Sequence, residues 1–173
     1  MQTVGKVYAE ALFSLAREER KEQQVYEELN QAADLMLQNP GFSTLLDVPT
    51  LRTEERIEVL RKVIGDNPGI TENFLCLLVE KHRFGRLSEI REAFNKQYHE
   101  AFGIAEVFVT SAVPLDEAQR SALKTKLQKK LGKTIQLRER VDSTLIGGMV
   151  VQYGDTRMDH SIKTRMKQFK QES

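Results

Sequence analysis

The sequence predicts an α+β protein, with an N-terminal six-helix bundle in residues 1–103 and a small C-terminal α/β domain of order β-α-β-β-β-α in residues 104–173. Three observations support this fold class. Apolar residues recur at helical spacing up to Gly103, they alternate as in strands after it, and no long linker separates the halves. Each half has the length of a small domain, so each can bury its own core.

The first half contains six stretches with the i, i+3, i+4, i+7 spacing of amphipathic helices. They cover residues 4–15, 25–36, 42–46, 53–64, 71–82 and 88–102. Start and stop signals bound them: Thr53, Thr71 and Ser88 as starts, and Gly65 and Gly103 as stops. Short loops between helices are typical of a compact bundle.

The second half combines strands with two helices. Strands are expected at residues 105–109, 135–141, 145–153 and in a short segment up to Met158, and helices at residues 116–131 and around Ile162, Met166 and Phe169. Asp116 and Gln119 have the spacing of a capping box, which predicts the start of the first of these helices. Gly154-Asp155 predicts a tight hairpin turn.

Composition excludes several classes of protein. The single cysteine, Cys76, lies in the apolar run of residues 74–79, so we expect a buried thiol and no internal disulfide, as in a reducing compartment. That run is far shorter than the roughly 20 apolar residues of a membrane helix. Any association with a membrane must therefore go through a partner.

Catalytic and metal-binding motifs are missing from the sequence. Residues 131–134, Leu-Gly-Lys-Thr, resemble the tail of a phosphate-binding loop, but Leu127 stands where the first glycine is required. His82, His99 and His160 have no second ligand at metal-binding spacing. We expect a non-enzymatic chain with no cofactor and no metal.

Charge differs between the halves: acidic residues outnumber basic ones up to Gly103, and basic residues are in excess after it. This asymmetry indicates different partners for the two halves. The lysines between Lys124 and Lys133 fit a solvated helix face or a face for an acidic protein. No aromatic residues lie among them, as RNA-binding surfaces have, so we expect no nucleic acid.

Two helices of the bundle are apolar over more of their circumference than one core requires. At about 100° per residue, the apolar arc spans about 240° of the first helix and about 200° of the fifth. A surface helix that packs on one core needs an apolar arc of only about 100°. A central position in the bundle would explain this surplus. So would a groove between the two helices that accepts an amphipathic partner helix.

Glycines and polar residues cluster near the end of the chain. Gly147-Gly148 inside the strand expected at residues 145–153 indicate a bulge or a close backbone approach. Gly154 and Asp155 form the expected hairpin, and Asp159 or Ser161 can cap the final helix. We interpret all six residues as a structural motif.

Three of these segments together resemble the delta subunit family of the F-type ATP synthase, which includes the oligomycin sensitivity-conferring protein. They are residues 8–13, Tyr-Ala-Glu-Ala-Leu-Phe, residues 74–87, ending in Phe-Gly-Arg-Leu, and the C-terminal series Asp142, Leu145 to Gly148, Gly154-Asp155, Asp159 and Ser161. The resemblance covers the whole chain. One departure is His160, where the family usually has glycine.

The resemblance implies a non-catalytic stator subunit of the rotary proton-translocating ATP synthase, placed peripherally at the cytoplasmic face of a bacterial cell membrane. Residues 1–103 would bind N-terminal segments of alpha subunits, and residues 104–173 the C-terminal ends of b subunits. The candidate alpha-subunit contacts are Tyr8, Ala11, Leu12, Leu15, Leu75, Leu78, Val79 and His82. The residues alone leave open a generic helical adaptor or an RNA-binding protein that uses its basic half.

Overall fold

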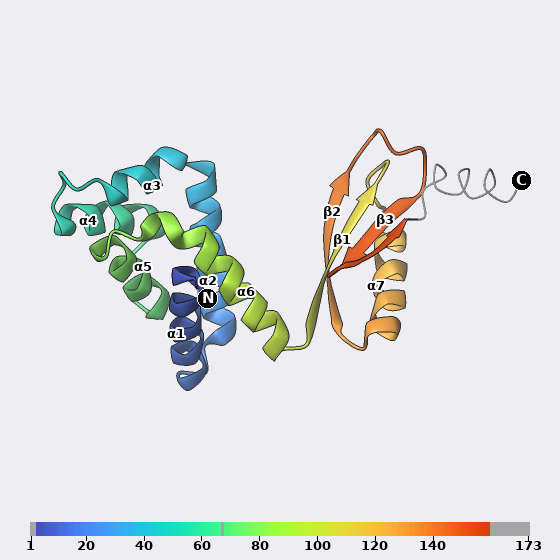
Figure 1. Cartoon of the computed structure of the whole chain (residues 1–173), viewed down its shortest axis with the longest axis horizontal. Coiled ribbons are helices and arrows are strands. Elements are labelled where there is room, and N and C mark those ends of the chain that lie inside the picture. Colours follow the sequence, from blue (N-terminus) through green and yellow to red (C-terminus); the bar gives the residue numbers. More distant parts are fainter. Residues whose placement is uncertain (1–2, 67, 160–173) are drawn as a thin grey trace, which may run out of the picture. The chain divides into compact units, whose positions relative to one another are not determined.

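The computed structural model describes residues 3–66 and 68–159 and contains both helices and a sheet (Figure 1). Seven α-helices and one four-stranded sheet lie within these residues. The chain divides into two compact units, Met1–Tyr98 and His99–Ser173. The boundary lies inside a helix, five residues before the Gly103 boundary expected from the sequence.

The first unit consists of helices joined by short loops. These are α1 (Val4–Glu18), α2 (Glu22–Gln38), α3 (Pro40–Asp47), α4 (Thr53–Ile64), α5 (Ile70–Glu80), the 3-10 turn η1 (Phe84–Arg86) and α6 (Leu87–Ala101). The helices pack around a common apolar interior, in which Leu29, Leu46, Leu60 and Phe94 are fully buried. Cys76 is buried in the same interior, as expected.

Three expected helix starts lie one residue from the observed ones. Thr53 is the first residue of α4 and follows its cap Arg52; the Thr53 hydroxyl accepts a hydrogen bond from the Arg56 side chain. Thr71 is the second residue of α5 and is buried, and Gly69 occupies the cap position. Leu87, not Ser88, opens α6 directly after η1. The glycine stops Gly65 and Gly103 are confirmed, both with positive φ.

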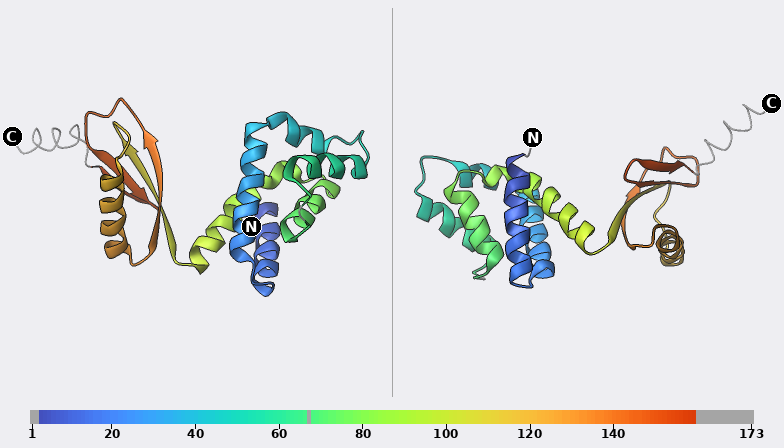
Figure 2. Two further views of the ribbon diagram at one scale, coloured as in Figure 1. Left: turned by 180° about the vertical axis from the view of Figure 1, so that it is seen from behind. Right: turned by 60° about the horizontal axis from the view of Figure 1, so that its bottom comes forward.

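The second unit is a four-stranded sheet covered on one face by a helix (Figure 2). Its elements are β1 (Ile104–Ser111), α7 (Glu117–Leu131), β2 (Thr134–Val141), β3 (Met149–Tyr153) and β4 (Thr156–Asp159). The strand order is β2-β1-β3-β4; β1 and β2 are parallel, and the other pairs are antiparallel. Alternate residues of β1, namely Ala105, Val107 and Val109, pack with Leu127 of α7.

The glycine pair does not lie inside a strand, which corrects the expected strand over residues 145–153. β3 begins only at Met149, and Gly147 and Gly148 precede it with φ of 64° and 74°. Such left-handed backbone cannot continue a β ladder, so the two glycines form the turn that enters β3. The expected bulge is therefore a loop.

The hairpin at Gly154-Asp155 is confirmed: Tyr153 pairs with Thr156, and Gly154 has φ of 55°. Asp159 ends β4. The predicted final helix, with Ser161 and His160, lies outside the described residues. No helix among the described residues is long and apolar enough to cross a membrane.

Candidate partner-binding groove

An apolar groove of about 410 Å³ lies in the first unit, between α1 and α5. It is lined by Val7, Tyr8, Ala11, Leu12, Leu15, Ile70, Asn73, Phe74 and Leu77. Asn73 is the one lining residue without a largely apolar side chain. Such a surface holds the apolar side of another molecule and offers little to a polar ligand.

The α1 wall is formed by side chains that the bundle core leaves uncovered. Val7 is 50% exposed and Leu15 is 45% exposed, whereas Leu12 between them is buried. Ala11 is exposed and lines the groove between these larger residues. Its small side chain leaves room for a close approach by a partner.

The α5 wall follows the i, i+3, i+4, i+7 spacing of one helix face, with Ile70, Asn73, Phe74 and Leu77. Phe74 is buried and packs edge-on against Tyr8, with ring centroids 6.2 Å apart. This aromatic pair joins the two helices at the base of the groove.

A polar contact secures Tyr8. The Arg83 side chain, which follows α5, donates a hydrogen bond to the Tyr8 hydroxyl over 3.0 Å, and its guanidinium lies 5.5 Å from the centre of the Tyr8 ring. Arg83 therefore fixes Tyr8 by both a hydrogen bond and a cation–π contact.

The sequence-based contact residues divide into two groups. Tyr8, Ala11, Leu12 and Leu15 line the groove. Leu75, Leu78 and Val79 do not: each is at most 1% exposed, because helical geometry turns them into the bundle interior while Phe74 and Leu77 face the groove. These three residues belong to the core of the first unit.

His82 also lies away from the groove lining. It follows α5 with a positive φ of 52°, and its ring contacts the guanidinium of Arg56. The residues missed by sequence reasoning are Val7, Ile70, Asn73, Phe74, Leu77 and Arg83. The apolar arc of α5 contained the signal for Phe74 and Leu77, but a helix wheel alone does not show which edge of the arc faces outward.

Arg56 holds the end of α5 in place from inside the bundle. Its side chain is buried on α4 and donates hydrogen bonds to the carbonyl oxygens of Leu46 and Val79 over 2.8 and 2.9 Å. These carbonyls lie in the last turns of α3 and α5. Arg56 thus ties three helices together behind the groove.

No catalytic chemistry is supported by the described side chains. Burial raises the pKa of the Cys76 thiol, which keeps it protonated and poorly nucleophilic. The residues that the structure describes contain no group of three His, Cys, Asp or Glu side chains able to hold a metal ion. The groove is suited to binding.

The match to a protein family decides the identity of the chain. Residues 4–172 match the family model described as ATP synthase delta (OSCP) subunit. The chain belongs to the ATP synthase delta (OSCP) subunit family. The stator role inferred from the resemblance is confirmed: this delta-family chain is a non-catalytic structural subunit of the ATP synthase peripheral stalk.

Individual relatives agree with the family. ATP synthase subunit delta of Lactobacillus gasseri is 34% identical over 99% of this chain and 94% of its own length. That of Symbiobacterium thermophilum is 36% identical over 95% and 89%. A relative from Ilyobacter tartaricus, 31% identical over 94% of each chain, is described as sodium ion specific.

One solved structure shares the fold. A chain of the Toxoplasma gondii mitochondrial ATP synthase hexamer aligns with a TM-score of 0.75, over 99% of this chain and 97% of its own, at 21% sequence identity. The delta-family chain thus has the mixed helix-and-sheet fold seen in an assembled synthase.

Proposed function

We propose that this delta-family subunit joins two partners in the stator: the first unit binds an N-terminal segment of an alpha subunit, and the second unit binds the C-terminal ends of b subunits. Attachment to the membrane is then indirect, through the complex, at the cytoplasmic face of a bacterial cell. The observation that carries the proposal is the exposed apolar groove between α1 and α5.

The groove has the dimensions and chemistry for one amphipathic helix. From Ile70 to Leu77 the α5 wall extends two helical turns, or about 10 Å. A partner helix with apolar residues at i, i+3, i+4 and i+7 presents a stripe of matching length. Each fully buried leucine-sized anchor contributes about 1.5–3 kcal/mol, so a few anchors suffice for specific binding.

Ala11 provides the test of the proposed groove. In Ala11→Leu the larger side chain occupies space between Tyr8 and Leu15, so a partner helix cannot approach as closely. We expect a peptide of the alpha-subunit N-terminus to bind at least about tenfold more weakly, equivalent to ~1.4 kcal/mol. Isothermal titration calorimetry with the purified chain measures this change.

Arg17→Leu is the matched control, because Arg17 is an exposed α1 residue outside the groove lining. This variant should bind the peptide like the wild type. Helical content by circular dichroism should be unchanged in both variants, since Ala11 is exposed as well. Normal peptide affinity in a well-folded Ala11→Leu chain would place the alpha-binding site elsewhere.

For the second unit, the proposal rests on charge. Residues 104–173 carry an excess of Lys and Arg, which suits an acidic stalk end.

A further inference from the structure

We propose that the sheet face turned away from α7 binds an acidic amphipathic helix of the partner, which lies along the strands between flanking arginines. We call this surface the arginine face; it comprises Phe108, Thr110, Arg138, Arg140, Gln152 and Arg157. The inference rests on the proposed binding of the stalk by the second unit, and it assigns the surface and the chemistry of the bound segment.

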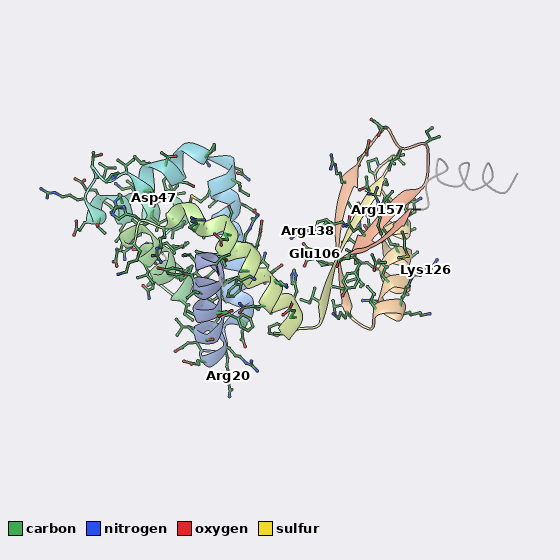
Figure 3. All side chains as sticks on the ribbon, in the orientation of Figure 1. Arg20, Asp47, Glu106, Lys126, Arg138 and Arg157 are labelled. Carbon is green, nitrogen blue, oxygen red and sulfur yellow. The ribbon has the colours of Figure 1, made fainter. Side chains whose placement is uncertain are left out.

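The pairing of the strands places these residues on one face. Phe108 of β1 lies opposite Arg138 of β2 and Gln152 of β3, and Gln152 lies opposite Arg157 of β4. Directly paired residues project from the same side of a sheet. These four paired residues therefore form a row across all four strands, with Phe108 on a central strand and an arginine on each edge strand. Arg138 and Arg157 are labelled in Figure 3.

This side is distinct from the core of the unit. Ala105, Val107 and Val109 pack with α7, so the intervening residues of β1 point to the opposite side. There Phe108 is 52% exposed, and a hollow of about 260 Å³ extends from it past Thr110, Arg140 and Arg157. An exposed phenylalanine within a hollow is suited to contact an apolar side chain of a partner.

Few carboxylates in the described part of the chain pair with the arginines of this face. Among the described residues, Arg140 and Arg157 form no ion pair, whereas Arg138 pairs with Glu106 over 2.7 Å. Asp142 is the other carboxylate beside the hollow; it accepts hydrogen bonds from the Thr144 amide and hydroxyl at 2.9 and 2.6 Å, and its charge also interacts with that of Arg140 without forming an ion pair. The guanidinium groups of Arg140 and Arg157 can therefore each accept an ion pair with a carboxylate of another chain.

The spacing of the arginines fits a helix. Three strand spacings separate Arg138 from Arg157, or about 14 Å, while a helix with its side chains is about 10–12 Å wide. Arg138 and Arg140 are two residues apart on β2, or about 7 Å, close to the separation of acidic residues one helical turn apart. A partner helix can therefore place an apolar stripe on Phe108 and acidic residues on both sides of that stripe, next to the arginines of the two edge strands.

Two other occupants fit less well. Residues 160–173 of the same chain contain more basic than acidic residues, so they would bring like charge to the arginine face. Nucleic acid fits less well because Phe108 is the single aromatic residue among the six that define the face, where a stacking surface usually has several. Charge complementarity favours an acidic protein helix.

The experiment measures binding of the full chain to the soluble part of the b subunit from the same enzyme. Reversal of charge in the double variant Arg140→Glu/Arg157→Glu should weaken binding at least about tenfold, and Phe108→Ala should weaken it severalfold. The matched control is Lys126→Glu/Lys129→Glu on exposed positions of α7, which changes net charge equally. The control should bind within about twofold of the wild type.

Each outcome bears on a different statement. If the wild type does not bind the b subunit, the proposed function of the second unit fails together with this inference. If the wild type binds and the arginine variants bind equally well, or if the α7 control is the weaker binder, only the arginine face is wrong. Tighter binding of a single-stranded RNA 20-mer than of the b subunit, abolished by the arginine reversals, would also overturn the inference.

Discussion

Arg56 is a buried cation whose charge is balanced by helix ends. It is 1% exposed, and among the described residues no carboxylate forms an ion pair with it. Its hydrogen bonds instead reach the carbonyl oxygens of Leu46 and Val79, at the C-terminal turns of α3 and α5. Carbonyl groups at these turns carry partial negative charge, so they stabilise the guanidinium where water cannot.

Replacement of Arg56 tests how much these hydrogen bonds contribute to the stability of the first unit. Arg56→Met keeps an unbranched side chain of similar length but leaves the two carbonyl groups and the Thr53 hydroxyl without their donor. We expect a loss of about 2–4 kcal/mol in the free energy of unfolding, measured by urea denaturation. Arg52→Met, on an exposed side chain, should change it by less than about 0.5 kcal/mol. Equal effects of the two changes would show that burial of Arg56 is incidental.

Residue roles were only partly predictable from the sequence. The apolar arcs of the first and fifth helices left open a central position or a groove, and the structure has a hollow between the two helices, where the exposed apolar surplus lies. They did not separate Leu78, in the core, from Leu77, in the groove, since both are leucines on one broad arc. The position of Gly147 and Gly148 was missed for a related reason: glycine signals unusual backbone but does not show whether a strand continues through it.

At the scale of elements, α6 ends in the second unit. His99, in its last turn, is buried, and it interacts with Glu106 and with Gln136 and Arg138 of β2. Burial is the main cause that lowers the pKa of His99 below its usual 6.5, and Arg138 acts in the same direction, against the opposing effects of Glu106 and Gln136. The neutral imidazole is therefore favoured in the folded state.

This shift predicts a pH dependence of the second unit. Below pH 6.5 the unfolded chain binds a proton at His99 more readily than the folded chain does, so stability is lost as the pH falls through this value and is retained above it. Hydrogen exchange of the β1 amides should therefore become faster relative to its intrinsic rate between pH 7.5 and 5.5. His99→Gln should flatten this dependence, while His82→Gln, in the first unit, should leave it unchanged. A slope that persists in His99→Gln would assign it to another group.

The elements with a strong local signal were predicted best. Asp116 and Gln119 form the expected capping box: the Asp116 carboxylate accepts from the Gln119 amide over 2.7 Å, and the Gln119 side chain accepts from the Asp116 amide over 3.1 Å. Both contacts lie within four residues, so sequence spacing is sufficient to predict them. The face of the sheet that carries Arg138 and Arg157 depends on pairing between distant strands, which periodicity alone does not fix.

At the scale of the whole molecule, two units with separate cores form one family member. The family match extends over residues 4–172 and thus through both units. The first unit offers an apolar groove and the second a basic sheet face. In the proposed function the two surfaces bind partners of different chemistry, and the subunit transmits load from one partner to the other through its own chain.

Such a linkage acts in series, which gives the final prediction. When two attachments in series carry the same load, failure of either one breaks the connection. If each attachment fails in a small fraction of the complexes, the total fraction of broken connections is close to the sum of the two. If the two attachments acted in parallel, either one would hold the head, and the connection would break only when both failed.

We therefore expect Ala11→Leu alone, and Arg140→Glu/Arg157→Glu alone, each to lower ATP-driven ion pumping per ATP hydrolysed in reconstituted vesicles. In the combined variant the losses should be close to their sum, because the substitutions lie in different units and act independently. If either single variant pumps normally despite weakened binding of its partner and only the combined variant fails, the two contacts are redundant and the load does not pass through this chain.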